Sequence, residues 1–297
     1  MAGRSNTLAH LMALATAIVW GATFVSTKIL LDHGLTPGGI MLYRFLIAYA
    51  LILPFAPRGE RARNPRDELL FVALGVTGGS FYFITENAAL GHTLASHVAI
   101  LVCTAPLFTA LLARAFLRER LKPLHWWGSI IAMTGVIVVV FNGRIVLQLD
   151  LVGDILSLAA ALSWGCYTVI ARRLDNRYST LFITRKVFFY GLLTLLPFFC
   201  FVPERAGLPV LLSAPVLWNL LFLGVLASFA CYILWNRAIK QLGATRASNY
   251  IYLNPVVTLV TSAIVLSERV TPLAIAGALL ILAGVYLGER QPGRERS

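Results

Sequence analysis

The chain has 297 residues, of which 58% are hydrophobic and only 13% are charged. Its mean hydropathy is +0.78, whereas a soluble globular domain carries about 25% charged residues. This composition excludes a disordered, fibrous or ordinary soluble protein and indicates a polytopic membrane protein.

Long apolar runs recur along the whole sequence, and each could cross a hydrocarbon core of about 30 Å. Because lipid offers no partner to backbone amides, such runs must be helical. Ten spans are predicted, near residues 8–30, 37–56, 68–90, 94–117, 123–141, 151–173, 180–202, 213–237, 244–266 and 272–288. The expected fold class is therefore an all-α integral membrane protein with ten transmembrane helices and short connections.

Basic residues are distributed unevenly between the two faces of these spans. Seventeen Lys and Arg residues fall on one side, against Arg144, Arg205 and Arg269 on the other. Since basic loops stay in the cytoplasm, both termini are predicted to be cytoplasmic. The same loops explain the net charge of +12, so this charge does not indicate nucleic acid as a partner.

The second half of the sequence matches the first at an offset of 149 residues over most of its length, and we call this correspondence the repeat alignment. The matched positions include Trp20-Gly21 and Trp164-Gly165, Gly75 and Gly224, Pro106 and Pro255, Glu119 and Glu268, Gly128 and Gly277, and Gly135 and Gly284. Only the offset near the start of each half differs, because the loop lengths differ. Residues 1–145 and 146–297 are therefore expected to form two repeats of five helices. Because five is odd, the repeats must be inverted, an arrangement typical of secondary transporters that bind substrate between the repeats.

Two prolines lie in the middle of the fourth and ninth spans, Pro106 and Pro255. Proline removes one hydrogen bond of a helix and clashes with the carbonyl four residues earlier, so each helix is expected to kink. The symmetric placement favours a pair of hinges. A purely structural kink is the alternative, because membrane helices tolerate proline.

Aromatic side chains supply most of the candidate substrate contacts. Trp20 and Trp164 lie well inside the first and sixth spans, away from the interfacial belt that Trp prefers, and Tyr167 shares a helix face with Trp164. Tyr82 and Tyr232 lie at the centre of the third and eighth spans. These five residues are predicted to line a cavity, with lipid contact as the alternative for the tryptophans.

Three further residues complete the predicted substrate site: Glu86, His97 and Tyr252. An acid inside a span is costly and is by default a functional candidate, so Glu86 could contact an ammonium group or carry a coupling proton. It could also sit at a solvated rim. His97 could reach the cavity or be an ordinary polar residue, and either face of the helix that carries Tyr252 could point inward.

Three other charged positions are assigned to the periphery or left open. Arg44 either extends toward the lipid headgroups or contacts substrate. Glu119 and Glu268 are expected to cap the helices that start at Pro123 and Pro272. The four cysteines have no paired spacing, and no spacing of ligands predicts a metal site or another cofactor.

These motifs together resemble the EamA-type branch of the drug/metabolite transporter superfamily. The matching elements are Trp20-Gly21, Lys28, Arg44-Phe45, Pro106, Glu119-Arg120, Gly128 and Gly135, with their second copies at Trp164-Gly165, Pro255, Glu268-Arg269, Gly277 and Gly284. The resemblance implies a ten-helix, inverted-repeat carrier of the bacterial inner membrane that exports small metabolites. Within the family the chain is similar to the YddG amino-acid exporters, which are associated with aromatic amino acids.

The function predicted from the sequence is export of amino acids, including aromatic ones, by a monomeric secondary transporter with alternating access. A proton is the candidate coupling ion, and no phosphate-binding loop for ATP is present in the sequence. Alternatives are export of drugs, quaternary cations or another metabolite, a channel, and an integral-membrane enzyme that modifies lipid. The enzyme would need a cluster of acids, His or Cys, and the loops do not offer one.

Overall fold

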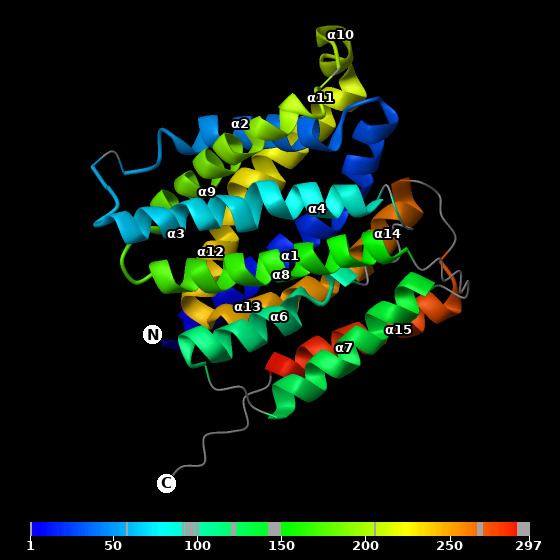
Figure 1. Cartoon of the computed structure of the whole chain (residues 1–297). Helices are drawn as coiled ribbons and strands as arrows, with labels where there is room; N and C mark the ends of the chain where they lie inside the picture. Colours follow the sequence, from blue (N-terminus) through cyan, green and yellow to red (C-terminus); the bar gives the residue numbers. More distant parts are fainter. Residues whose placement is uncertain are drawn as a thin grey trace.

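The computed structural model describes residues 2–57, 59–90, 92, 98, 101–119, 123–141, 150–204, 206–265 and 270–289. Every regular element in this part of the chain is a helix (Figure 1). Five helical stretches are long and apolar enough to cross a membrane: Thr7–Asp32, Pro65–Ala89, Leu151–Leu174, Thr180–Cys200 and Ala214–Leu242. Four shorter apolar helices accompany them: Pro37–Ile52, Ala105–Leu117, Pro123–Val139 and Pro272–Gly288.

In chain order the elements are α1 (Ala2–Asp32), α2 (Pro37–Ile52), α3 (Pro65–Gly75), η1 (Val76–Ser80), α4 (Phe81–Leu90), α6 (Ala105–Leu112), η2 (Ala113–Leu117), α7 (Pro123–Phe141), α8 (Leu151–Leu174), α9 (Thr180–Leu195), η3 (Leu196–Cys200), α10 (Leu208–Leu211), α11 (Ala214–Leu221), η4 (Phe222–Ala230), α12 (Cys231–Leu242), α13 (Ala244–Ser248), η5 (Asn249–Leu253), α14 (Asn254–Val265) and α15 (Pro272–Glu289). The chain runs back and forth, so α1 begins and α15 ends at the same end of the bundle (Figure 1).

Several helices begin where the local sequence dictates. Thr36, Asn64, Asp150 and Ser179 each accept a hydrogen bond from a backbone N–H three residues later, at the starts of α2, α3, α8 and α9. These side chains satisfy amides that have no partner inside the helix. Proline occupies the first turn of α2 and α3, where its missing N–H costs nothing.

The two central prolines do not kink continuous α-helices, which corrects the sequence-based expectation. Pro106 lies in the first turn of α6, after a turn at Cys103 and Thr104. Pro255 lies in the first turn of α14, after the 3₁₀-helical segment η5. The α-helical hydrogen-bond pattern is interrupted before each proline, by a turn before Pro106 and by the 3₁₀ segment before Pro255. Each proline therefore lies in the first turn of an α-helix rather than in its interior.

The third helix of each half is interrupted in a corresponding way. The π-helical segment η1 separates α3 from α4, and the π-helical segment η4 separates α11 from α12. Under the repeat alignment, η1 falls within η4. Such wide turns inside α-helices are frequent at functional sites.

Glycine contacts show that the two halves are interleaved. A Cβ on Gly75 would lie 2.3 Å from Cβ of Tyr190 on α9, and a Cβ on Gly224 would lie 2.7 Å from Cβ of Ile47 on α2. The third helix of each half therefore packs against the second helix of the other half.

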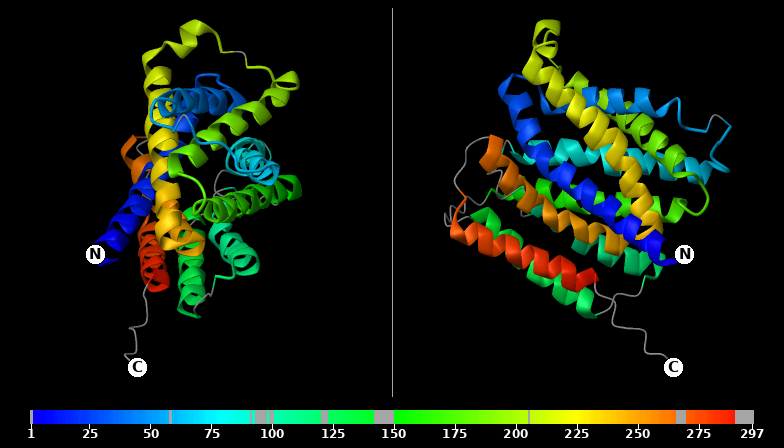
Figure 2. Two further views of the ribbon diagram at one scale, coloured as in Figure 1. Left: turned by 90° about the vertical axis from the view of Figure 1, so that its left-hand side faces the viewer. Right: turned by 180° about the vertical axis from the view of Figure 1, so that it is seen from behind.

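The first and fourth helices exchange partners in the same manner. A Cβ on Gly21 would lie 2.5 Å from Cβ of Val257, and one on Gly165 would lie 3.2 Å from Cβ of Phe108; Val257 and Phe108 are related by the repeat alignment. Figure 2, right, shows the resulting packing of α1 between α12 and α14.

The contact between α7 and α15, the last helix of each half, is symmetric under the repeat alignment. Gly128 packs against Gly284, and Gly135 packs against Gly277, with the two helices antiparallel. The repeat alignment converts the first of these pairs into the second. Close approach of backbones at small residues is the usual way for membrane helices to associate.

Candidate functional site

Six aromatic residues from four helices meet at the centre of the bundle, and we call them the central aromatic cluster: Trp20, Tyr82, Trp164, Tyr167, Tyr232 and Trp235. The ring centroids of Trp20 and Trp164 are 5.1 Å apart and meet edge to face. Trp20 also lies 5.1 Å from Trp235, and Tyr82 lies 5.2 Å from Trp164. The two tryptophans related by the repeat are therefore in direct contact.

Five of the eight predicted substrate-site residues lie in this cluster. The prediction did not include Trp235, which is fully buried against Trp20; its signal was the correspondence with Glu86 under the repeat alignment. Tyr252 is buried in η5, and within the described part of the chain it makes no ring contact with the cluster. His97 lies outside the described residues.

The cluster is tied to the two π-helical segments by hydrogen bonds. Trp20 Nε1 donates to the carbonyl of Ala227 in η4 at 2.9 Å, and the Tyr232 hydroxyl donates to the carbonyl of Gly78 in η1 at 2.6 Å. Trp164, which corresponds to Trp20 in the second half, makes no equivalent hydrogen bond to a described residue. The buried Nε1 atoms of Trp164 and Trp235 have no hydrogen-bond partner among the described residues, although buried donors usually have one.

Two opposite charges lie beside the cluster. Glu86 on α4 is 8% exposed, and its Oε1 accepts a hydrogen bond of 2.9 Å from the Tyr82 hydroxyl. Arg44 on α2 is 5% exposed, and its Nε donates to Ser228 Oγ in η4 at 2.9 Å. Arg44 therefore does not extend to the headgroups, and Glu86 is not at a solvated rim.

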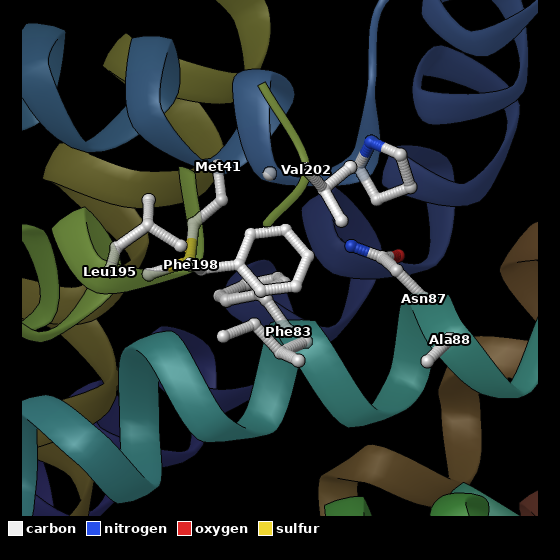
Figure 3. A pocket seen from close by; sticks show the side chains of 10 residues that line it. Met41, Phe83, Asn87, Ala88, Leu195, Phe198 and Val202 are labelled. Atoms are coloured by element: carbon white, nitrogen blue, oxygen red, sulfur yellow. The ribbon is translucent and has the colours of Figure 1, made fainter. Parts of the chain in front are cut away.

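A cavity of about 110 Å³ opens on the neighbouring face of α4. Its lining includes Phe83 and Asn87, which face Met41 of α2 and Phe198 of η3 (Figure 3). The Phe83 ring also lies under the Arg44 guanidinium, at 4.8 Å from its central carbon. Phe83 thus stands between the cavity and Arg44. We call this side of the molecule, where α2 begins and α4 and α9 end, the pocket end.

The opposite end, where α3 and α9 begin and α8 and α12 end, is the network end. Asp67 is 2% exposed and binds two groups that precede α9: Arg177 Nη1 at 2.6 Å and the Tyr178 hydroxyl at 2.6 Å. Glu68 pairs with Lys186 Nζ at 2.5 Å and accepts from the Tyr190 hydroxyl. Both acids belong to the first half, and all four partners belong to the second.

Glu119 adds a further link between the halves at the network end. Its carboxylate accepts from the backbone N–H groups of Ala244 and Thr245 at 3.1 and 3.3 Å, and from the Thr245 hydroxyl at 2.7 Å. Glu119 therefore caps the start of α13 in the other half. The expected cap on the following helix at Pro123 was wrong, because sequence proximity does not reveal a helix start brought near by folding. Glu268 lies outside the described residues.

Metal binding receives no support from the described residues, where no group of three or more His, Cys, Asp or Glu side chains is arranged to hold an ion. The cysteines Cys103, Cys166, Cys200 and Cys231 are free. The chemistry available at the centre is thus aromatic packing, two indole donors without a described partner and two buried opposite charges.

Comparison with known proteins agrees with this arrangement. The model of the EamA-like transporter family matches residues 7–141 and again residues 151–288. A probable terminal-alkyne amino-acid exporter of Streptantibioticus cattleyicolor is 31% identical, with 95% of this chain and 93% of the relative covered. A probable amino-acid metabolite efflux pump of Escherichia coli is 29% identical over 93% of both chains. A solved crystal structure has the same fold, with a TM-score of 0.76, 19% identity and coverage of 95% of this chain and 96% of the other.

Proposed function

The chain belongs to the EamA-like transporter family, as its motifs predicted, and from this premise we propose that it is a secondary carrier that exports amino acids by alternating access. Membership of this family and the long apolar helices make it a multi-pass membrane protein and a transporter. Direction, substrate and mechanism are the proposed part.

The exchanged glycine contacts are the observation that carries the mechanism. Each half supplies helices that pack against the other half in corresponding places, as Gly75 and Gly224 illustrate. Two such halves, residues 1–145 and 146–297, can exchange conformations at similar energy, which gives two access states related by symmetry. We infer ten crossings in two inverted five-helix repeats, with both termini in the cytoplasm of a bacterial cell and the protein in its inner membrane.

The helix breaks at Pro106 and Pro255 support a hinge at each of them. Pro106 begins an α-helix after a turn, and Pro255 begins one after a 3₁₀-helical segment. Hinges are usually a few positions at the ends of elements that absorb changes in φ and ψ. Non-helical backbone at membrane depth is tolerated where protein or a cavity covers it.

Amino acids are the proposed substrates for two reasons. The two named relatives carry printed names that refer to amino-acid export, and the central aromatic cluster offers ring surfaces to an apolar or aromatic side chain. We propose the cluster residues, together with Glu86, as the substrate site, with Tyr252 and His97 as outer members. The carrier is proposed to act as a monomer with a proton as coupling ion.

Counterflow in proteoliposomes tests this function. Vesicles loaded with unlabelled phenylalanine or leucine should accumulate the labelled amino acid transiently, and the initial rate should saturate. A panel with quaternary cations tests the alternative function, export of such cations, which the aromatic cluster and Glu86 could also bind. Accumulation of the cations without any amino acid would overturn the substrate proposal. Flux that never saturates would point to a channel.

A further inference from the structure

Arg44 and Glu86 both lie against α4, since the Arg44 guanidinium is over the ring of Phe83, one helical turn before Glu86. No salt bridge among the described residues joins them. Of the five N–H donors of Arg44, only Nε has a partner within the described residues, and that partner is neutral. The described partner of Glu86 is likewise neutral, the Tyr82 hydroxyl. Each buried charge therefore keeps binding capacity that no described side chain uses.

An unpaired charge at this depth is expensive. A charged residue inside a membrane protein is normally paired with an opposite charge or marks a substrate pathway, and a buried charge without a partner is strongly destabilising. Apolar side chains at positions 44 and 86 would avoid this cost entirely. Their retention as a separated pair of opposite charges suggests that a ligand completes the pairing.

The surroundings of the two charges indicate the chemical class of the ligand. The aromatic cluster lies against Glu86 through Tyr82. The ring of Trp164, whose indole N–H has no partner among the described residues, packs on Tyr82. The Arg44 guanidinium lies over Phe83, which lines the cavity of the pocket end. A cation, an anion and ring surfaces thus adjoin one another along α4, next to the cavity that Phe83 lines.

We propose that Arg44 and Glu86 recognise the two charges of a zwitterionic α-amino acid, with the guanidinium binding its carboxylate, the Glu86 carboxylate binding its ammonium group, and the side chain of the substrate lying on the central aromatic cluster. This inference rests on the proposed function, and it assigns the substrate class and two specificity residues. The guanidinium is suited to the carboxylate because it can donate two parallel hydrogen bonds.

The arrangement is asymmetric in a way that orients the substrate. Both charges come from the first half, and under the repeat alignment Glu86 corresponds to Trp235 in the second half. The first half therefore reads the backbone charges of the amino acid, and the second half supplies mainly ring surface.

Analogues of phenylalanine test the proposal on the unaltered carrier. Phenylalanine amide lacks the carboxylate, and N-acetylphenylalanine lacks the ammonium group, while both keep the ring. Losing one charged hydrogen bond should weaken competition against phenylalanine counterflow by about tenfold or more for each analogue. Equal competition by the amide and by phenylalanine would overturn recognition of the carboxylate, and equal competition by the acetyl compound would overturn recognition of the ammonium group.

Variants then assign each charge to its residue. Arg44→Gln should weaken phenylalanine binding by about tenfold or more but leave binding of the amide nearly unchanged. Glu86→Gln should weaken phenylalanine binding to a similar extent but leave binding of the acetyl compound nearly unchanged. Arg44→Lys keeps the charge but loses the paired donors, so its binding of phenylalanine should be intermediate between that of the unaltered carrier and that of Arg44→Gln. Arg66→Gln and Asp32→Asn change exposed residues and serve as matched controls with unaltered competition.

The outcomes separate the two levels of the proposal. Absence of counterflow by any amino acid in the unaltered carrier would refute the proposed function. Counterflow by the unaltered carrier, combined with equal loss of phenylalanine and both analogues in Arg44→Gln and Glu86→Gln, would leave the function intact and refute the zwitterion site. If either glutamine variant fails to fold, Arg44→Lys and the analogue series on the unaltered carrier still decide the question.

Discussion

The network end and the pocket end are joined by different kinds of contact. At the network end, carboxylates of the first half bind groups of the second half: Asp67 to Arg177, Glu68 to Lys186 and Glu119 to Thr245. At the pocket end, Glu204 binds Thr36 and Ser26 donates to Asn219, but the lining of the cavity is almost entirely apolar.

This difference bears on which end could separate during transport. Charged hydrogen bonds are directional and must break as a set when two surfaces separate, whereas apolar side chains such as Met41 can repack as a gap widens. The network end is therefore the more firmly joined of the two ends. Under the proposed alternating access with cytoplasmic termini, this arrangement would correspond to a state that faces the outside.

Asp67→Ala, at the network end, should cause the largest loss of stability. It removes the partner of Arg177 and Tyr178 from a buried position, and the cost should be about 2–3 kcal/mol because Arg177 is partly exposed. Thermal unfolding in detergent should show a clear drop in midpoint, which Asp32→Asn at an exposed position should not show. An unchanged midpoint would mean that the network end is not held by this link.

Glu119→Gln should have a smaller effect, confined to the start of α13. The substitution keeps the shape but weakens a charged cap, at a cost of about 1–2 kcal/mol. Hydrogen exchange at residues 244–248 should become faster, while exchange at the cap of α8 on Asp150 should stay the same. If the substitution left the exchange rate at residues 244–248 unchanged, or raised it equally at the start of α8, the role of Glu119 as a cap of α13 would be wrong.

Pro255→Ala tests whether the helix start at this proline is a hinge in the change between the two access states. Since Pro255 occupies the first turn of α14 and no interior hydrogen bond is at stake, the cost in stability should be below about 1 kcal/mol. The transport rate, in contrast, should fall several-fold if the break before this proline is a hinge, and Pro106→Ala should behave alike. Full transport rates in both variants would remove the hinges from the account.

The smallest effect is expected at the pocket end. Ala88 lines the cavity and is exposed, so Ala88→Phe can fill part of the space without overpacking the core. The thermal midpoint should stay nearly unchanged, and counterflow should slow more for phenylalanine than for alanine. Equal slowing of both substrates would place the cavity outside the substrate path.

The helices were predictable because each one depends on its own local composition. Apolar runs predicted where helices form, and the placement of Trp20 and Trp164 inside their apolar runs predicted their central position. The two tryptophans do meet at the centre. The internal repeat also carried the signal for the packing of Gly128 and Gly135, since a symmetric contact leaves matching small residues in both copies.

The rest depends on contacts between segments far apart in the chain. Nothing near Glu119 indicates that its carboxylate binds Thr245, and nothing near Arg44 shows that Ser228 lies beside it. Pro255 was predicted to kink a continuous α-helix because proline alone predicts a kink, whereas a 3₁₀ segment precedes it in the structure. Tertiary packing decides whether a helix bends at such a position or ends there.

Paired distance measurements at the two ends test the central claim most directly. Spin labels at Arg66 and Arg237 would report on the network end, and labels at His33 and Phe201 would report on the pocket end, since all four positions are exposed. As the carrier in proteoliposomes is taken through its transport cycle, the account predicts that a population with a wider network end and a narrower pocket end appears. Two distances that stay constant, or that widen together, would contradict alternating access by two inverted repeats.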